Sequence, residues 1–181
     1  MSDPLTIDVQ RSGKRFDAEA LLDLPAPAQT VWDTITDYDA LPRFMPGIRA
    51  CRVLERHPGA GGAERLVVEQ HGEFRFLLFA QAMRVRLHIA HETLRVAEAK
   101  AVSFELGLLR RRAVDVFEGR YEILRPSGHI MAGTAPHTQL RYTARIELHL
   151  PPPPTIGSLA VRQNLQAQLE ALAREVRRRG G

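Results

Sequence analysis

The chain has 181 residues, a formal net charge of +4 and an apolar fraction of 44%, values that are ordinary for a soluble globular protein of one domain. No window approaches the roughly 18 uninterrupted apolar residues of a membrane span, and the N-terminus lacks the apolar region of a secretory signal. Cys51 is the only cysteine, which excludes an intrachain disulfide and a cysteine-rich zinc site and fits a reducing, cytoplasmic environment.

The first 14 residues are polar and unpatterned, and we expect a flexible tail at 1–14 followed by a single domain at 15–181. Between Arg15 and Leu24, apolar residues alternate with mostly polar ones. This is the period of a half-buried strand. Pro25 and Pro27 end the strand, and Pro27 suits the first turn of a helix because its missing N–H would be unsatisfied there anyway.

A group of acids surrounds the only tryptophan, Trp32, in the stretch TVWDTITDYDALPRFMPG. Acids and a phenol this close suit either general acid–base chemistry or the caps of short helices. We expect capping. The Asp37 carboxylate can accept hydrogen bonds from the free amides of a second short helix, YDALPRF, and Asp39 in its first turn complements the positive end of the helix dipole.

Period-two patterning predicts a series of strands in the middle of the chain. They cover residues 47–57, 64–79, 83–91, 101–109, 116–124 and 138–150. The glycine-rich stretch PGAGGAE is expected to be a hairpin connection, because it lacks the Lys-Ser/Thr pair and the helix of a phosphate-binding loop. One apolar and one polar face on each strand are typical of an antiparallel sheet that is covered on one side.

After PPPPTIG, residues Leu165, Leu169, Leu172 and Val176 recur at helical spacing. They predict a helix of about twenty residues, which is long enough to span roughly 30 Å. It is the element able to cover the apolar face of the sheet. The predicted fold class is therefore α+β: a curved antiparallel sheet wrapped around a long C-terminal helix, with two short helices after the first strand. A sheet gripping one helix leaves space for a ligand between them.

Several stretches carry a family resemblance. The segment LPAPAQTVWDTITDYDALPRFMPGIRACRVL has an Ala-Pro, Val-Trp, Asp-Tyr, Leu-Pro, Phe and Pro-Gly pattern that is typical of one branch of a known superfamily. Further matches to that branch are RLVVEQHGEFRF, EGRYEIL, QLRYTARIEL and PPPPTIG. From about Arg15 to Arg178 the chain resembles the START-like superfamily, also called SRPBCC or helix-grip proteins. It is similar in particular to the polyketide cyclase/dehydrase and coenzyme Q-binding branch.

The resemblance implies a helix-grip fold with a hydrophobic cavity that relatives use for lipids, quinones or polyketides. It also implies that catalytic members, the aromatase/cyclases, act mainly by shaping a reactive chain with a few polar pocket residues. Bacterial relatives are often called ribosome-association proteins, and eukaryotic relatives assist ubiquinone function. No defined catalytic residue set of this branch maps onto the chain.

The sequence gives little support for a metal site or for a catalytic nucleophile. His88 and His91 are three apart, which places them on opposite faces of a strand, and no His-Glu-x-x-His or comparable ligand set exists. Cys51 lies within a strand, where a small buried thiol is the usual outcome. We therefore expect no metal and no cofactor.

The candidate site residues fall into two groups. The first group would line the pocket with apolar side chains and two phenols, which need a polar partner when buried: Phe44, Met45, Phe74, Phe76, Met83, Phe104, Phe117, Tyr121, Tyr142, Leu165 and Leu169. The same residues would also serve as plain core. The second group, Arg110, Arg111 and Arg112, forms a basic surface that can meet an anionic membrane, nucleic acid or a ribosome, or remain a solvated face.

These observations predict a non-catalytic carrier for a hydrophobic small molecule such as a quinone, an isoprenoid or another lipid. An aromatase/cyclase-type enzyme in which Tyr121 or another pocket polar group orients a polyketide is the alternative. A ribosome- or RNA-associating protein that uses its arginine clusters is a second alternative.

Overall fold

The computed structural model describes residues 5–76, 79–107, 111–112, 114–124, 136–150 and 157–181. In chain order the elements are β1 (Leu5–Ser12), β2 (Arg15–Leu24), α1 (Ala28–Thr36), η1 (Tyr38–Ala40), α2 (Leu41–Phe44), β3 (Ile48–Pro58), η2 (Ala60–Gly62), β4 (Ala63–Phe76), β5 (Phe79–Glu92), β6 (Val96–Leu106), β7 (Arg111–Arg112), β8 (Val114–Leu124), β9 (Thr138–Leu148) and α3 (Gly157–Gly180).

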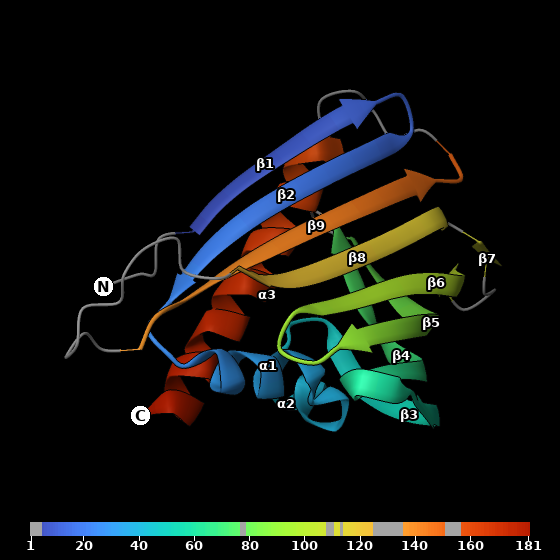
Figure 1. Ribbon diagram of the computed structural model, residues 1–181. Coiled ribbons are helices and arrows are strands. Elements are labelled where there is room, and N and C mark those ends of the chain that lie inside the picture. Colours follow the sequence, from blue (N-terminus) through green and yellow to red (C-terminus); the bar gives the residue numbers. More distant parts are fainter. Residues whose placement is uncertain (1–4, 77–78, 108–110, 113, 125–135, 151–156) are drawn as a thin grey trace.

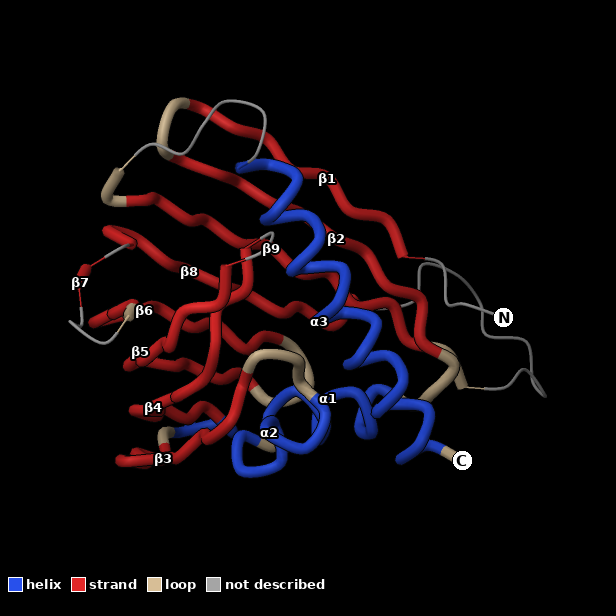
Figure 2. Tube along the Cα trace, turned by 180° about the vertical axis from the view of Figure 1, so that it is seen from behind, coloured by secondary structure: helices blue, strands red, loops and turns tan. Residues whose placement is uncertain are grey.

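The strands within the described residues form one nine-stranded antiparallel sheet in the order β1-β2-β9-β8-β6-β5-β4-β3, with the short β7 paired to β6. The sheet curves around α3, which runs across its concave side (Figures 1 and 2). The helix packs against β1, β2 and α1. Its buried face includes Leu165, Leu169, Leu172 and Val176, so the predicted α+β helix-grip architecture is confirmed.

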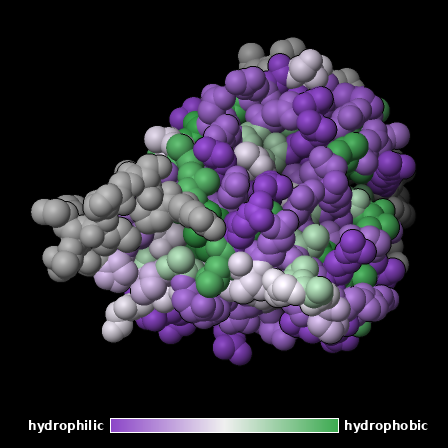
Figure 3. Space-filling view, in the orientation of Figure 1, coloured by the Kyte–Doolittle hydropathy of each residue, from purple (hydrophilic) through white to green (hydrophobic). Residues whose placement is uncertain are grey.

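The sheet has an apolar inner face and a charged outer face, as the period-two pattern predicts. On β5, Val85, Leu87 and Ile89 are buried, whereas Arg86 and His88 are exposed. The part of the outer face turned to the viewer in Figure 1 is mostly hydrophilic (Figure 3). Several of its arginines and lysines form ion pairs with carboxylates on neighbouring strands, for example Arg145 with Asp17 at 3.4 Å.

The expectation of a loose tail at 1–14 is wrong for Leu5–Ser12, which forms strand β1 and pairs with β2. Leu5, Ile7 and Val9 alternate with exposed residues and pack on the core. Gly13 turns the chain with a φ of 62°, a conformation that glycine adopts without steric cost. The two short helical segments therefore follow the second strand and not the first.

Other predicted boundaries also differ. The strand predicted at 64–79 is two strands, because β4 ends at Phe76 and β5 already includes Phe79. The second short helix is a 3-10 turn, η1, followed by the single-turn α2. The glycine-rich stretch connects β3 to β4 as a hairpin, as predicted.

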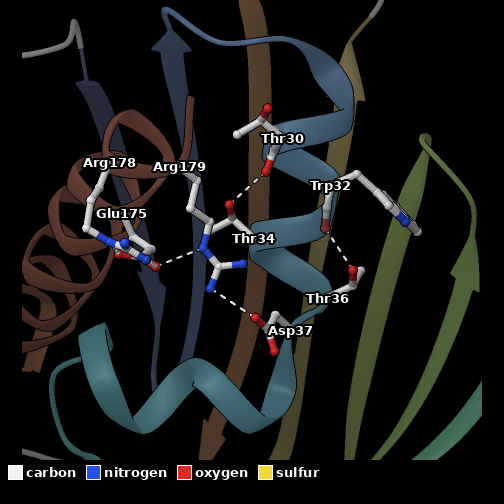
Figure 4. A network of polar contacts seen from close by, with 8 residues as sticks. All are labelled: Thr30, Trp32, Thr34, Thr36, Asp37, Glu175, Arg178 and Arg179. Atoms are coloured by element: carbon white, nitrogen blue, oxygen red, sulfur yellow. Dashed lines mark hydrogen bonds and ion pairs between the residues drawn. The ribbon is translucent and has the colours of Figure 1, made fainter. Parts of the chain in front are cut away.

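The capping role predicted for Asp37 is wrong. Asp37 occupies the residue before η1, yet its side chain makes no cap hydrogen bond. Its carboxylate instead accepts a hydrogen bond from Arg179 Nη2 at 2.9 Å, on the last turn of α3 (Figure 4). The guanidinium adds a full opposite charge to the hydrogen bond, which a backbone amide does not have. Asp39 lies in the first turn of η1, as predicted.

Candidate ligand-binding interior

The concave side of the sheet collects most of the predicted pocket residues into one apolar cluster. Four of them are buried: Met45, Tyr142, Leu165 and Leu169. Five others pack against this core and remain half-buried: Phe44, Met83, Phe104, Phe117 and Tyr121. The side chains of Phe74 and Phe76 lie outside the described part of the chain. Half-buried aromatic side chains on an inward face retain surface that a bound molecule can cover.

A belt of small residues crosses the inner face at one level of the sheet. The strand register places Ala18 opposite Ala144, Ala144 opposite Gly119, and Gly119 opposite Ala99. A side chain added at Gly119 would project toward the Tyr142 hydroxyl, at 3.1 Å, and toward the Phe117 ring. The belt therefore faces the interior, and at Gly119 the Tyr142 and Phe117 side chains pack over the space that its missing side chain leaves.

Two aromatic pairs flank this belt. The ring centroids of Phe104 and Phe117 are 6.0 Å apart on one side. Those of Tyr121 and Tyr142, directly opposite each other on β8 and β9, are 4.7 Å apart on the other. Burial raises the pKa of Tyr142 to about 12 and raises the pKa of Tyr121 as well. Both phenols are thus neutral hydrogen-bond donors across the physiological pH range.

His91 and Tyr38 are two polar residues of this region that the sequence analysis does not select as site residues. Both are buried, and the Tyr38 hydroxyl lies 2.6 Å from His91 Nε2. The period-two pattern that directs Ile89 inward also directs His91 inward, two residues later. That signal is present in the sequence, whereas the approach of Tyr38 depends on how η1 packs against the sheet.

His91 also lines a hollow of about 410 Å³ that borders the apolar cluster at Trp32. Trp32 and Thr36 of α1 line one side of the hollow, and residues of the β3–β4 and β5–β6 connections line the other. Trp32 points from α1 toward the strands (Figure 4), where its ring meets His91 edge-on at 5.5 Å. The buried imidazole thus contacts both Trp32, which lines this hollow, and the Tyr38 ring.

The outer face of the sheet carries another hollow, of about 420 Å³. It is lined mainly by charged and polar side chains of β1, β2, β6, β8 and β9, including Asp17, Glu118 and Arg120. Its charges are compensated within the sheet, since Arg120 and Lys100 each pair with Glu98. This hollow does not have the chemistry of a hydrophobic ligand site.

The predicted basic surface is described only in part. Arg110 and the side chain of Arg111 lie outside the described residues. The Arg112 guanidinium forms an ion pair with Asp115, with Nε 3.1 Å from Oδ1, which reduces the charge that it offers to a partner.

Among the described residues, no three His, Cys, Asp or Glu side chains are grouped so as to hold a metal ion. None of the described helices combines the length and the apolar character of a membrane span.

Solved structures share this architecture. A START superfamily protein from Mycobacterium smegmatis matches with a TM-score of 0.69 and 16% identity, over 90% of this chain and 97% of that one. A STAR-related lipid transfer protein from Xanthomonas axonopodis matches with a TM-score of 0.67 and 12% identity, over 96% and 93%. The Zhui aromatase/cyclase from Streptomyces sp. R1128 matches with a TM-score of 0.65 and 20% identity, over 91% and 95%.

At these identities the structural likeness shows the fold alone. No curated protein matches the sequence. The family model described as polyketide cyclase / dehydrase and lipid transport matches residues 24–173, a range that runs from the end of β2 into α3 and includes the whole small-residue belt except Ala18. The chain therefore belongs to the polyketide cyclase / dehydrase and lipid transport family.

Proposed function

We propose that the protein binds a hydrophobic small molecule, such as a quinone, an isoprenoid or another lipid, between the concave face of the sheet and α3, and that it acts as a carrier. The observation that carries the proposal is the partial exposure of the inward aromatic side chains Phe104, Phe117 and Tyr121, which pack against the core on the concave side of the sheet. Apolar walls with a few polar groups are characteristic of ligand pockets.

The direct test is native mass spectrometry of the purified full chain. We expect an added mass that organic extraction removes and that has the solubility of a lipid. The absence of any extractable apolar molecule, together with no measurable affinity for added quinones or lipids, would contradict the proposal.

A matched pair of variants tests the interior volume. Ala99→Leu adds a larger side chain at the half-buried belt, and Ala20→Leu adds the same side chain at a fully buried position of β2. Overpacking a filled core costs about 1–3 kcal/mol. We expect Ala20→Leu to lower the free energy of unfolding by such an amount, and Ala99→Leu to cost less while displacing the bound molecule. An equal loss of stability in both variants would indicate a filled interior.

An aromatase/cyclase-type activity is the second candidate. Tyr121 and Tyr142 favour it, because neither hydroxyl forms a hydrogen bond within the described part of the chain. Two neutral donors can hold a reactive carbonyl chain in one conformation. The test is formation of an aromatic product from a linear poly-β-keto thioester. We expect Tyr121→Phe to slow this reaction. Product formed at the wild-type rate by that variant would remove the role of Tyr121.

The arginine clusters are not part of the proposal. Arg112, Arg178 and Arg179 are each paired with a carboxylate, and exposed pairs of this kind leave less net charge for an anionic partner.

A further inference from the structure

We propose that the hollow between α1 and the β3–β4 and β5–β6 connections is a second binding site, and that it takes a small uncharged molecule with several hydroxyl groups, such as a monosaccharide. Its volume of about 410 Å³ lies toward the lower end of the range of small-molecule sites. The site is independent of the proposed function, because it differs from the apolar interior in place and in chemistry.

The walls of the hollow are held together by hydrogen bonds. The Thr93 hydroxyl donates to the carbonyl oxygen of Gly62 at 2.6 Å and so joins the β5–β6 connection to the β3–β4 connection. The Thr36 hydroxyl donates to the carbonyl oxygen of Trp32 at 2.8 Å within α1 (Figure 4). Leu94, next to Thr93, has a φ of 58°, and a residue other than glycine keeps this conformation only where its surroundings impose it. The walls are therefore formed before a ligand arrives.

The charges of the hollow cancel. Among the described residues that line it, Arg56 and Glu64 are the charged ones, and Arg56 Nη1 donates to Glu64 Oε1 at 2.7 Å. The other oxygen of this carboxylate lies 3.4 Å from His91 Nδ1. Burial lowers the pKa of His91, so the imidazole is neutral at pH 7. A charged ligand would lose hydration beside a residue of its own sign, which is costly, whereas an uncharged ligand would not.

Several polar groups of the hollow keep the capacity for further hydrogen bonds. The indole N–H of Trp32 donates no hydrogen bond to a described residue. Arg56, with a side chain that is 56% exposed, has N–H groups beyond the one bonded to Glu64. The Thr36 and Thr93 hydroxyls already donate their protons to carbonyl oxygens and therefore meet a ligand as acceptors. Donors and acceptors thus surround the same small volume.

Hydroxyl groups match this mixture better than other uncharged groups. A hydroxyl donates and accepts through one oxygen, whereas a carbonyl only accepts and an amide has its donor and its acceptor at fixed places. A ring with several hydroxyls also has C–H groups, which can pack on Pro58 and on the exposed edge of Trp32. A monosaccharide combines these properties.

The only tryptophan of the chain lines the hollow, so its single indole N–H signal in a nitrogen–proton NMR spectrum reports on this site. Three probes with one ring skeleton are titrated into the full chain: D-glucose, D-glucosamine with its added ammonium group, and D-glucuronate with its added carboxylate. We expect glucose to shift the indole signal saturably, and the two charged probes to bind about five- to tenfold more weakly.

An indole signal that none of the three probes moves would overturn the site. A charged probe that binds as tightly as glucose, or more tightly, would overturn the assignment to an uncharged molecule. Neither result bears on binding in the apolar interior.

The variant Arg56→Gln tests the charge balance. It leaves the Glu64 carboxylate as the charge of the hollow, so glucosamine should then bind more tightly than glucose, and glucuronate should bind more weakly than it does to wild type. Arg52→Gln, at an exposed position of the same strand that does not line the hollow, is the control and should keep the wild-type order of affinities. An unchanged preference for glucose in Arg56→Gln would overturn the role of the Arg56–Glu64 pair in selecting the ligand.

Discussion

Arg179 and Asp37, which are 142 residues apart in the chain, are joined by a hydrogen bond of 2.9 Å. The same guanidinium donates through Nε to the Glu175 carboxylate at 2.8 Å and lies over the Phe44 ring at 5.9 Å. One side chain thus fixes the last turn of α3 to the junction of α1 and η1. The arginines in the last turn of α3, Arg177 to Arg179, therefore include a structural connection.

Arg179→Ala should lower the free energy of unfolding by about 1–3 kcal/mol, because it leaves the Glu175 and Asp37 carboxylates with fewer donors in a partly buried site. The Arg179 side chain is 21% exposed and that of Glu175 is 9% exposed. Urea unfolding measures the change. Arg174→Ala, on an exposed position of the same helix, is the control and should stay within about 0.5 kcal/mol of wild type. Equal values for both variants would contradict the structural role of Arg179.

Glu175 should make stability fall in acid. Hydrogen bonds from Arg178 and then Arg179 lower its pKa to about 2, compared with 4.5 for an ordinary glutamate. A depressed native pKa stabilises the protein above the unfolded pKa, and this contribution is lost as the pH falls from about 4.5 toward 2. We expect about 2 kcal/mol of acid-dependent stability to disappear in Glu175→Gln. Glu170→Gln, exposed on α3, is the control. A Glu175→Gln variant with the acid sensitivity of wild type would show that the carboxylate is not linked to unfolding.

His91 should titrate below the ordinary value of 6.5, because burial disfavours its charged form more than Glu64 favours it. NMR of the imidazole carbon–proton pairs during a pH titration measures this pKa directly. A depressed native pKa also means that the histidine stabilises the protein above about pH 6.5 and loses this contribution in acid. A pKa above 6.5 would show that the Glu64 charge outweighs burial.

Gly72→Ala should destabilise the protein severely. A Cβ at Gly72 would lie 1.9 Å from the carbonyl oxygen of Gly47, and that oxygen accepts the hydrogen bond of the Glu73 amide at 2.8 Å. Relief requires the backbone to shift, so we expect a loss above about 3 kcal/mol. Gly61→Ala, where φ is 66° but no atom lies within 4 Å, should cost only the 1–2 kcal/mol of its left-handed conformation. Comparable urea midpoints for the two variants would contradict the close approach.

Cys51 should react slowly with thiol reagents. Burial raises its pKa to about 11, against a smaller opposing effect of a hydrogen bond with Gln70. Since the thiolate is the reactive form, we expect the native protein at pH 8 to react with a disulfide reagent at least about tenfold more slowly than the urea-unfolded chain. Similar rates in both states would show that the thiol is accessible.

The sequence predicts the faces of the elements better than their partners. Alternation along β5 and β9 and the helical spacing of Leu165 and Leu169 assign each residue to an inner or an outer face, and the structure agrees. These patterns depend on the period of one element alone. The pattern at Leu5, Ile7 and Val9 is just as regular, but polar neighbours at both ends of this short strand conceal it.

The register between strands and the long-range packing of the elements cannot be predicted from such patterns. The row that aligns Tyr142, Tyr121 and His91 depends on how four strands are offset from one another, and hydrophobic alternation fixes each offset only to a multiple of two residues. The stacking of Tyr38 on His91 and the bond of Asp37 to Arg179 depend on where η1 lies relative to the sheet and α3. Helix capping involves neighbours in the sequence, whereas Asp37 accepts a hydrogen bond from Arg179, 142 residues away.

The pairing of β2 with β9 also has a consequence for the order of folding. It brings together residues such as Asp17 and Arg145, which are 128 positions apart, while β3 to β6 pair with near neighbours in sequence. During synthesis the β1–β2 segment emerges before the other strands of the sheet, yet its inner edge has no partner until β9 has left the ribosome. Contacts of such long range slow folding to milliseconds or longer. Until β9 pairs with it, the β2 edge would be an unpaired strand edge of the kind that chaperones protect.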